Sequence, residues 1–88
     1  NYFNTMYSNV SKEDWNAVIA YGLPVYTHNI ERNNSSFTSG SAVCFNLGKA
    51  YESTGDIEKA KEFYQATINL YPTSSDAGYA EYRLSLLQ

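Results

Sequence analysis

The sequence is poor in several residue types, and each shortage excludes a class of structure. Cys44 is the single cysteine among 88 residues, so no disulfide can form within the chain. Charged residues make up only 17% of the sequence, the net charge is −3 and no run of Lys and Arg occurs. Nucleic-acid binding requires clustered cations, and no apolar run approaches the roughly 18 residues of a membrane span. We therefore expect neither a nucleic-acid partner nor a membrane span.

Residues that carry chemistry are equally sparse. His28 is the only histidine, and we read it as a single surface imidazole. No metal-ligand spacing, phosphate-binding glycine loop or convincing carboxylate pair occurs. Cys44 has no base nearby in the sequence that could activate it as a nucleophile, so we predict that it packs on an inward helix face. The sequence thus predicts no catalytic residue, no metal and no cofactor, and we expect no enzymatic activity.

What the chain does contain is enough apolar material for one packed domain. Hydrophobic residues make up 43% of it and aromatic residues 16%, including nine tyrosines, which argues against disorder. The chain begins at Asn1 without Met and ends in an apolar pattern, which we read as a processed chain or an excised fragment. Frequent Asn, Ser, Thr and Tyr with few charges favour a cell-envelope or secreted setting.

Helix signals begin in the N-terminal third. Residues 1–10 have apolar spacings of three and four, as in a short helix end or a packed arm. Ser11 and Asp14 form a capping-box pattern, which predicts a helix from about Lys12. Pro24 removes a backbone donor and predicts a kink or break, with the helical pattern reaching about Arg32. The polar segment 33–40 is the clearest loop in the chain.

The second half of the chain contains three further helix patterns. Residues 41–53 and 57–71 are predicted to form two helices, with Gly55 as a left-handed C-cap and Asp56 as the next N-cap. The helix from residue 57 shows apolar residues on two faces, with Ile57 on one and Leu70 on the other. Thr73 and Asp76 form a second capping box, which predicts a last helix from about Ser74 or Ser75 to Leu87.

A repeat signature runs through this region. Its residues are Leu47, Gly48, Tyr51, Gly55, Ala60, Tyr64 and Pro72. The spacing resembles the tetratricopeptide repeat through nearly all of residues 41–74, with two departures: Cys44 stands where the family often has Trp, and Thr67 where it prefers Ala. The resemblance implies an all-α fold of antiparallel helix-turn-helix repeats, with about four to five helices.

Partial copies suggest how a single domain over residues 1–88 is organised. Residues 12–32 resemble the second helix of a divergent first repeat, residues 41–72 a complete repeat, and residues 74–88 the first helix of a further repeat or a capping helix. The pattern around Leu84 repeats that of Leu47 at an offset of 37. The run from Tyr71 to Tyr82 resembles the longer repeats of bacterial envelope proteins.

In this family the first helix of each repeat lines a concave groove. Carried onto this sequence, the groove residues are Ala42, Phe45, Asn46, Lys49, Glu52, Tyr79, Tyr82 and Leu86. The aromatic residues would be apolar anchors, while Asn46 and Lys49 could hold a carboxylate or a peptide backbone. The alternative is that Phe45 and Tyr82 pack on each other and that Lys49 is a solvated charge. The several Lys, Arg and Asn residues of a C-terminal carboxylate clamp are not visible, so we reject that subtype.

The resemblance implies a non-catalytic scaffold module that binds a protein or peptide. An envelope assembly factor in the bacterial periplasm is the expected context, with the cytoplasm as the alternative. A second hypothesis is architectural self-association into a homo-oligomer, favoured by the apolar residues Trp15, Leu86 and Leu87. A third is that the chain is an accessory domain of a larger enzyme.

Overall fold

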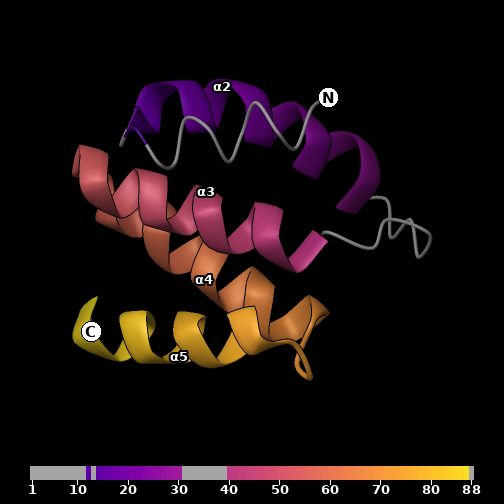
Figure 1. Ribbon diagram of the computed structural model, residues 1–88. Coiled ribbons are helices and arrows are strands. Elements are labelled where there is room, and N and C mark those ends of the chain that lie inside the picture. The colour runs from indigo at the N-terminus through magenta and orange to yellow at the C-terminus, as the bar shows by residue number, and fades with distance from the viewer. Residues whose placement is uncertain (1–11, 13, 31–39, 88) are drawn as a thin grey trace.

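The computed structural model describes residues 12, 14–30 and 40–87 (Figure 1). These residues form the α-helices α2 (Trp15–Val25), α3 (Gly40–Thr54), α4 (Ile57–Leu70) and α5 (Ser75–Leu87), and the π-helix η1 (Tyr26–Ile30). Within the described ranges no residue lies in a β-strand, and the predicted all-α fold is confirmed. Gly40 was assigned to the loop but begins α3; the predictions for residues 1–10 and 33–39 fall outside the described residues.

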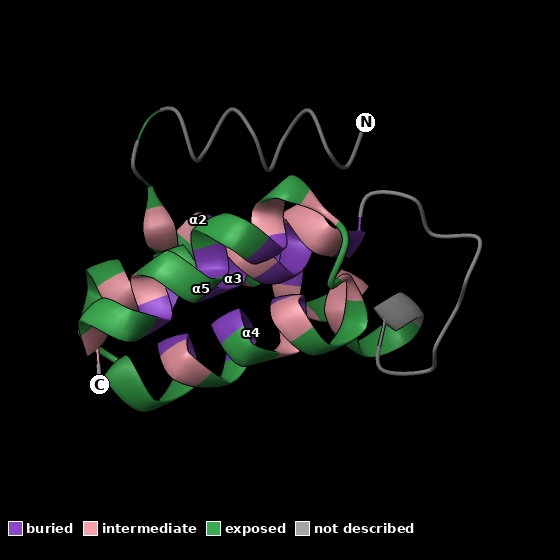
Figure 2. Cartoon of the chain, turned by 90° about the horizontal axis from the view of Figure 1, so that it is seen from below, coloured by how far each residue is buried: buried purple, intermediate pink, exposed green. Residues whose placement is uncertain are grey.

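The helices stack in chain order. α3 and α4 form an antiparallel pair, α2 and η1 pack on one side of α3, and α5 packs against α4 and α3 on the other (Figure 1). Buried residues lie on the faces that the helices turn toward one another (Figure 2). Val18, Val43, Leu47 and Tyr64 are fully buried in this core. α3, which contacts each of the other elements, is therefore the centre of the stack.

The start of the first described helix differs from the prediction. α2 begins at Trp15 instead of near Lys12, because Asp14 is the N-cap and its carboxylate accepts a hydrogen bond of 3.3 Å from the Ala17 N–H. Pro24 lies inside α2 and has no N–H to donate. The helix nevertheless continues: the Tyr26 N–H donates to the carbonyls of Gly22 and Leu23, and a π-helical turn follows.

The turn between α3 and α4 is as predicted. Gly55 has φ 95°, a left-handed conformation that glycine adopts at little cost. The Asp56 N–H donates to the Tyr51 carbonyl at 2.9 Å. The Asp56 side chain then accepts from the Lys59 N–H at 3.2 Å and caps α4.

The end of α4 and the capping residue of α5 each differ from the prediction by one residue. α4 ends at Leu70, with Tyr71 as its C-cap. At the start of α5 the capping side chain is Ser74, whose hydroxyl accepts from the Ala77 N–H at 3.1 Å, and not Thr73. α5 then runs from Ser75 to Leu87, as expected.

Close packing of α3 on α4 depends on a small residue at the crossing. A Cβ atom on Gly48 would lie 2.7 Å from Cδ1 of Tyr64, closer than carbon atoms tolerate. Thr67, which stands where the tetratricopeptide pattern prefers Ala, is fully buried, and its hydroxyl donates to the Phe63 carbonyl at 2.8 Å. Ile57 and Leu70, at the two ends of α4, stay exposed at 36% and 42%. The expected apolar coverage on two faces therefore holds only for the middle of α4.

Candidate functional site

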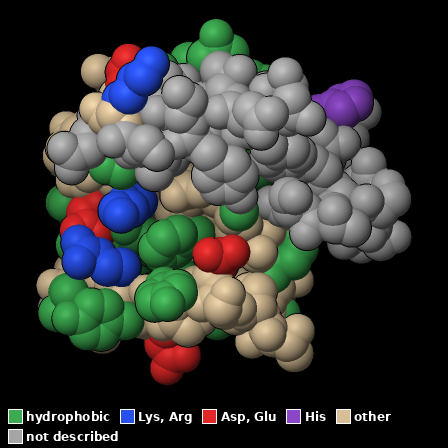
Figure 3. Space-filling view, in the orientation of Figure 1, with side chains coloured by type: hydrophobic (Ala, Val, Ile, Leu, Met, Phe, Trp, Pro, Cys, Tyr) green, Lys and Arg blue, Asp and Glu red, His purple; other side chains and the backbone are tan. Residues whose placement is uncertain are grey.

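The candidate site is the surface that α3 and α5 share, which we call the α3–α5 face. Figure 3 shows hydrophobic side chains gathered over these helices, with basic and acidic side chains among them. The face contains the predicted groove residues of α3 and α5. Their individual environments differ, and several are engaged within the protein.

Exposed apolar residues form a stripe on α5. Tyr79, Tyr82 and Leu86 are exposed at 63%, 62% and 57%, which makes them half of the six exposed large hydrophobic residues in the described chain. Spacings of three and four place them on one side of the helix. A stripe of this kind, with two tyrosines, has the composition of a protein-binding surface.

Phe45 connects this stripe to the core. Its ring is half-buried, with its centroid 5.8 Å from that of Tyr64 and 6.2 Å from that of Tyr79. The α5 ring beside Phe45 is therefore that of Tyr79. The alternative prediction, that Phe45 packs on Tyr82, named the wrong tyrosine. Phe45 thus packs on Tyr64 of the core and is also partly exposed on the α3–α5 face. Tyr82 is 62% exposed.

Asn46 and Ala42 lie deeper than groove-lining residues are expected to. Ala42 is half-buried, and Asn46 is only 8% exposed. The Asn46 amide has no hydrogen-bond partner among the described residues, although buried polar groups normally have one. Such an amide can donate to and accept from a peptide backbone.

Lys49 is exposed but not simply solvated. Its amine lies 5.8 Å from the centroid of the Trp15 ring, within the range of a cation–π contact. This contact brings the start of α2 to the edge of the α3–α5 face. Trp15 itself is half-buried against the core, as is Leu87, so of the three residues named for self-association only Leu86 is exposed.

Glu52 is the centre of a polar cluster that joins three helices. Its carboxylate accepts from Arg83 Nε on α5 at 3.1 Å and from the Tyr64 hydroxyl on α4 at 2.7 Å, and a second Arg83 nitrogen pairs with its other oxygen. Burial alone would raise the pKa of Glu52, but the hydrogen bonds from Arg83 and Tyr64 outweigh it, so that this pKa lies below its usual value. Burial and Glu52 together raise the pKa of Tyr64.

Two contacts of this face were not predicted from the sequence. Arg83 was not assigned a role, although it follows Tyr82 and stands at the same repeat offset from Asn46 as Leu84 does from Leu47. At the other end of the face, the Ser41 hydroxyl donates to the Asp76 carboxylate at 3.0 Å and joins the first turns of α3 and α5. The repeat offset indicates a position equivalent to Asn46 for Arg83, but no sequence pattern indicates that Arg83 pairs with Glu52.

Cys44 is the candidate nucleophile of the described residues, and it is a free cysteine. Cys44 is fully buried, and burial raises the pKa of its thiol to about 12, so it is protonated near neutral pH. No group of three or more His, Cys, Asp or Glu side chains in the described residues could hold a metal ion. No helix within those residues is long and apolar enough to cross a membrane.

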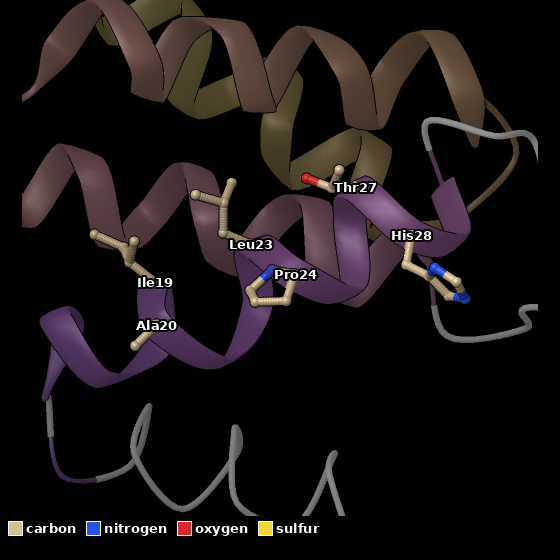
Figure 4. A pocket seen from close by; sticks show the side chains of 6 residues that line it. All are labelled: Ile19, Ala20, Leu23, Pro24, Thr27 and His28. Atoms are coloured by element: carbon tan, nitrogen blue, oxygen red, sulfur yellow. The ribbon is translucent and has the colours of Figure 1, made fainter.

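A shallow hollow of about 490 Å³ lies along α2 and η1 (Figure 4). Its described lining is Ile19, Ala20, Leu23, Pro24, Thr27 and His28. His28 is exposed, as predicted. These six residues come from one continuous helix, and one helix does not enclose a ligand by itself. We therefore assign no ligand to this hollow.

Comparison with known proteins agrees with the repeat signature. Residues 41–74 match the family model of the tetratricopeptide repeat, and they include all of α4 and all of α3 except Gly40. Neither the curated proteins nor the solved structures gave a match. The chain is thus an all-α protein in which residues 41–74 match the tetratricopeptide repeat, a unit that generally mediates protein–protein interaction.

Proposed function

We propose that the α3–α5 face binds a segment of another protein or a peptide, without covalent chemistry. The observation that carries this proposal is the stripe of Tyr79, Tyr82 and Leu86, each more than half exposed, in the helix that follows the matched repeat. Exposed apolar patches often mark interaction sites, and tyrosine is enriched among the residues that dominate binding energy. Phe45, whose ring lies beside that of Tyr79, extends the same face onto α3.

Two repeat assignments belong to this proposal. We propose that α2 and η1 are the second helix of a divergent first repeat, and that α5 is the first helix of a further repeat or a capping helix. The contacts of α3 with α2 on one side and with α5 on the other support this order. An envelope assembly role in the periplasm stays a prediction from the composition.

The test compares two alanine variants in partner binding. Tyr82→Ala removes an exposed ring from the stripe, and Leu70→Ala removes a side chain that is 42% exposed on α4. With the partner identified by cross-linking and then purified, Tyr82→Ala is expected to weaken binding by about tenfold or more, as at an interface hot spot. Equal affinities of Tyr82→Ala, Leu70→Ala and the unaltered chain would contradict the proposal.

Self-association is the second candidate, because Leu86 is 57% exposed on the same stripe. In that case two copies would cover each other's α5. Sedimentation equilibrium at several concentrations separates the two candidates. A dimer at low micromolar concentration that Leu86→Ser dissociates would favour self-association, and a monomer would leave the face free for a foreign partner.

A further inference from the structure

We propose that Glu52 sets the charge selectivity of the α3–α5 face, so that the face takes an uncharged, apolar peptide segment and rejects acidic ones. The inference rests on the function proposed above and names the class of partner. Arg83 is the only basic residue of α5. Its guanidinium is already paired with Glu52, and the inference follows from that pairing.

The Arg83 guanidinium is held from within the protein. Two of its nitrogens contact the two oxygens of Glu52, and the Tyr64 hydroxyl donates to one of those oxygens at 2.7 Å. The Glu52 side chain is 17% exposed and that of Arg83 is 37% exposed. The Nε/Nη2 edge of the guanidinium, which could bind an incoming carboxylate through two hydrogen bonds, is therefore already filled by Glu52.

The charged side chains of α3 and α5 include more acidic than basic groups. α3 and α5 carry two basic residues, Lys49 and Arg83, and three acidic residues, Glu52, Asp76 and Glu81. The Lys49 amine is held near the Trp15 ring. An acidic side chain that approached Arg83 would meet the Glu52 carboxylate or displace it, which would leave Glu52 partly buried without its cation. Rejection of the wrong partner by a like charge is a common source of specificity.

The apolar side chains define what the face accepts instead. Tyr79, Tyr82 and Leu86 offer exposed apolar surface beside the occupied ion pair, and Figure 3 shows hydrophobic and charged side chains next to one another over α3 and α5. An extended segment with aliphatic, aromatic or proline side chains covers such a stripe without removing a charge from water.

The experiment uses a random-sequence peptide display library as the probe. Selections are run on the unaltered chain, on Glu52→Gln, on the double variant Glu52→Gln/Arg83→Gln and on Glu62→Gln, which removes the same charge from an exposed position of α4. Glu52→Gln keeps the shape of the side chain and frees the charge of Arg83. Circular dichroism of each variant confirms that the helices are retained.

The expected result is that the unaltered chain and Glu62→Gln enrich apolar peptides with few Asp and Glu. Glu52→Gln is expected to gain about tenfold or more in affinity for synthetic peptides that carry one acidic residue. The double variant is expected to lose that gain, because the gain requires the freed Arg83. The same acidic content after selection on Glu52→Gln and on the unaltered chain would overturn the inference while leaving peptide binding intact. Failure of all four proteins to enrich any peptide would overturn the proposed function and this inference with it.

Discussion

Arg83 of α5 and Glu52 of α3 form an ion pair that joins the matched repeat to the helix that follows it. Tyr64 of α4 donates to the same carboxylate at 2.7 Å, so one acidic side chain connects three helices. A carboxylate with several donors is more strongly held than a simple surface pair. The cluster therefore fixes how α5 sits against α3 at the edge of the candidate binding face.

The first prediction concerns acid sensitivity. The pKa of Glu52 is lower in the folded chain than its usual value, so its stabilising contribution is fully present above the unfolded-state pKa. That contribution is lost as the pH falls through the folded-state pKa. We expect the unfolding free energy to fall more steeply in the unaltered chain than in Glu52→Gln once the pH drops below about 4.3, the ordinary value for glutamate.

Urea unfolding over a pH series measures this effect. At neutral pH we expect Glu52→Gln to cost about 1 kcal/mol, a small value because Arg83 is 37% exposed and solvent screens the pair. Glu62→Gln, on exposed α4 surface, is the control for a general change in net charge. Parallel pH profiles for the unaltered chain and Glu52→Gln would show that the pair does not contribute as described.

The second prediction concerns the crossing of α3 and α4. Gly48→Ala places a Cβ atom 2.7 Å from Cδ1 of the Tyr64 ring, and the ring cannot swing away freely because its hydroxyl is bonded to Glu52. Overpacking of this kind is expected to cost about 1–3 kcal/mol. Thermal or urea unfolding gives the value directly.

Gly78→Ala is the matched control for that substitution. A Cβ atom on Gly78 has nothing within 4 Å, and alanine is favoured over glycine in a helix by about 0.5–1 kcal/mol. The two glycine-to-alanine changes should therefore shift the melting temperature in opposite directions. A Gly48→Ala variant as stable as the unaltered chain would be incompatible with the packing of Tyr64 on Gly48.

The third prediction concerns the reactivity of Cys44. Because its side chain is fully buried and its thiol pKa is raised to about 12, we expect almost no reaction with a thiol reagent in the native state at pH 8. In urea the thiol should react at the rate of a free cysteine. Rapid native-state labelling would show that Cys44 is accessible and that α3 is packed differently.

The fourth prediction separates packing from surface within the aromatic residues. Phe45→Ala removes a half-buried ring that contacts Tyr64 and Tyr79, so we expect a stability loss of about 1–3 kcal/mol. Tyr82 is 62% exposed, and Tyr82→Ala should change stability by only about 0.5 kcal/mol. Comparable losses for both variants in urea unfolding would mean that Tyr82 belongs to the core and not to the binding face.

Most of the helices and the turns between them could be predicted from local patterns in the sequence. Gly55 and Asp56 specify the turn between α3 and α4 through interactions within a few residues of the chain, and the structure agrees at both positions. The cap of α2 was misread because Ser11 and Asp14 both have side chains that can cap a helix. Only the structure shows that the Asp14 carboxylate accepts the hydrogen bond from the Ala17 N–H.

The class of fold could be predicted from the sequence, because the small residues Gly48 and Ala60 and the apolar spacing around them are local to one pair of helices. It also indicated the candidate face, through the register of a repeat. The contacts that each residue of that face makes were visible only in the folded chain. The pairing of Glu52 with Arg83 and the contact of Lys49 with Trp15 join residues that are far apart in the chain. Such contacts depend on how the helices stack, and no local pattern specifies that.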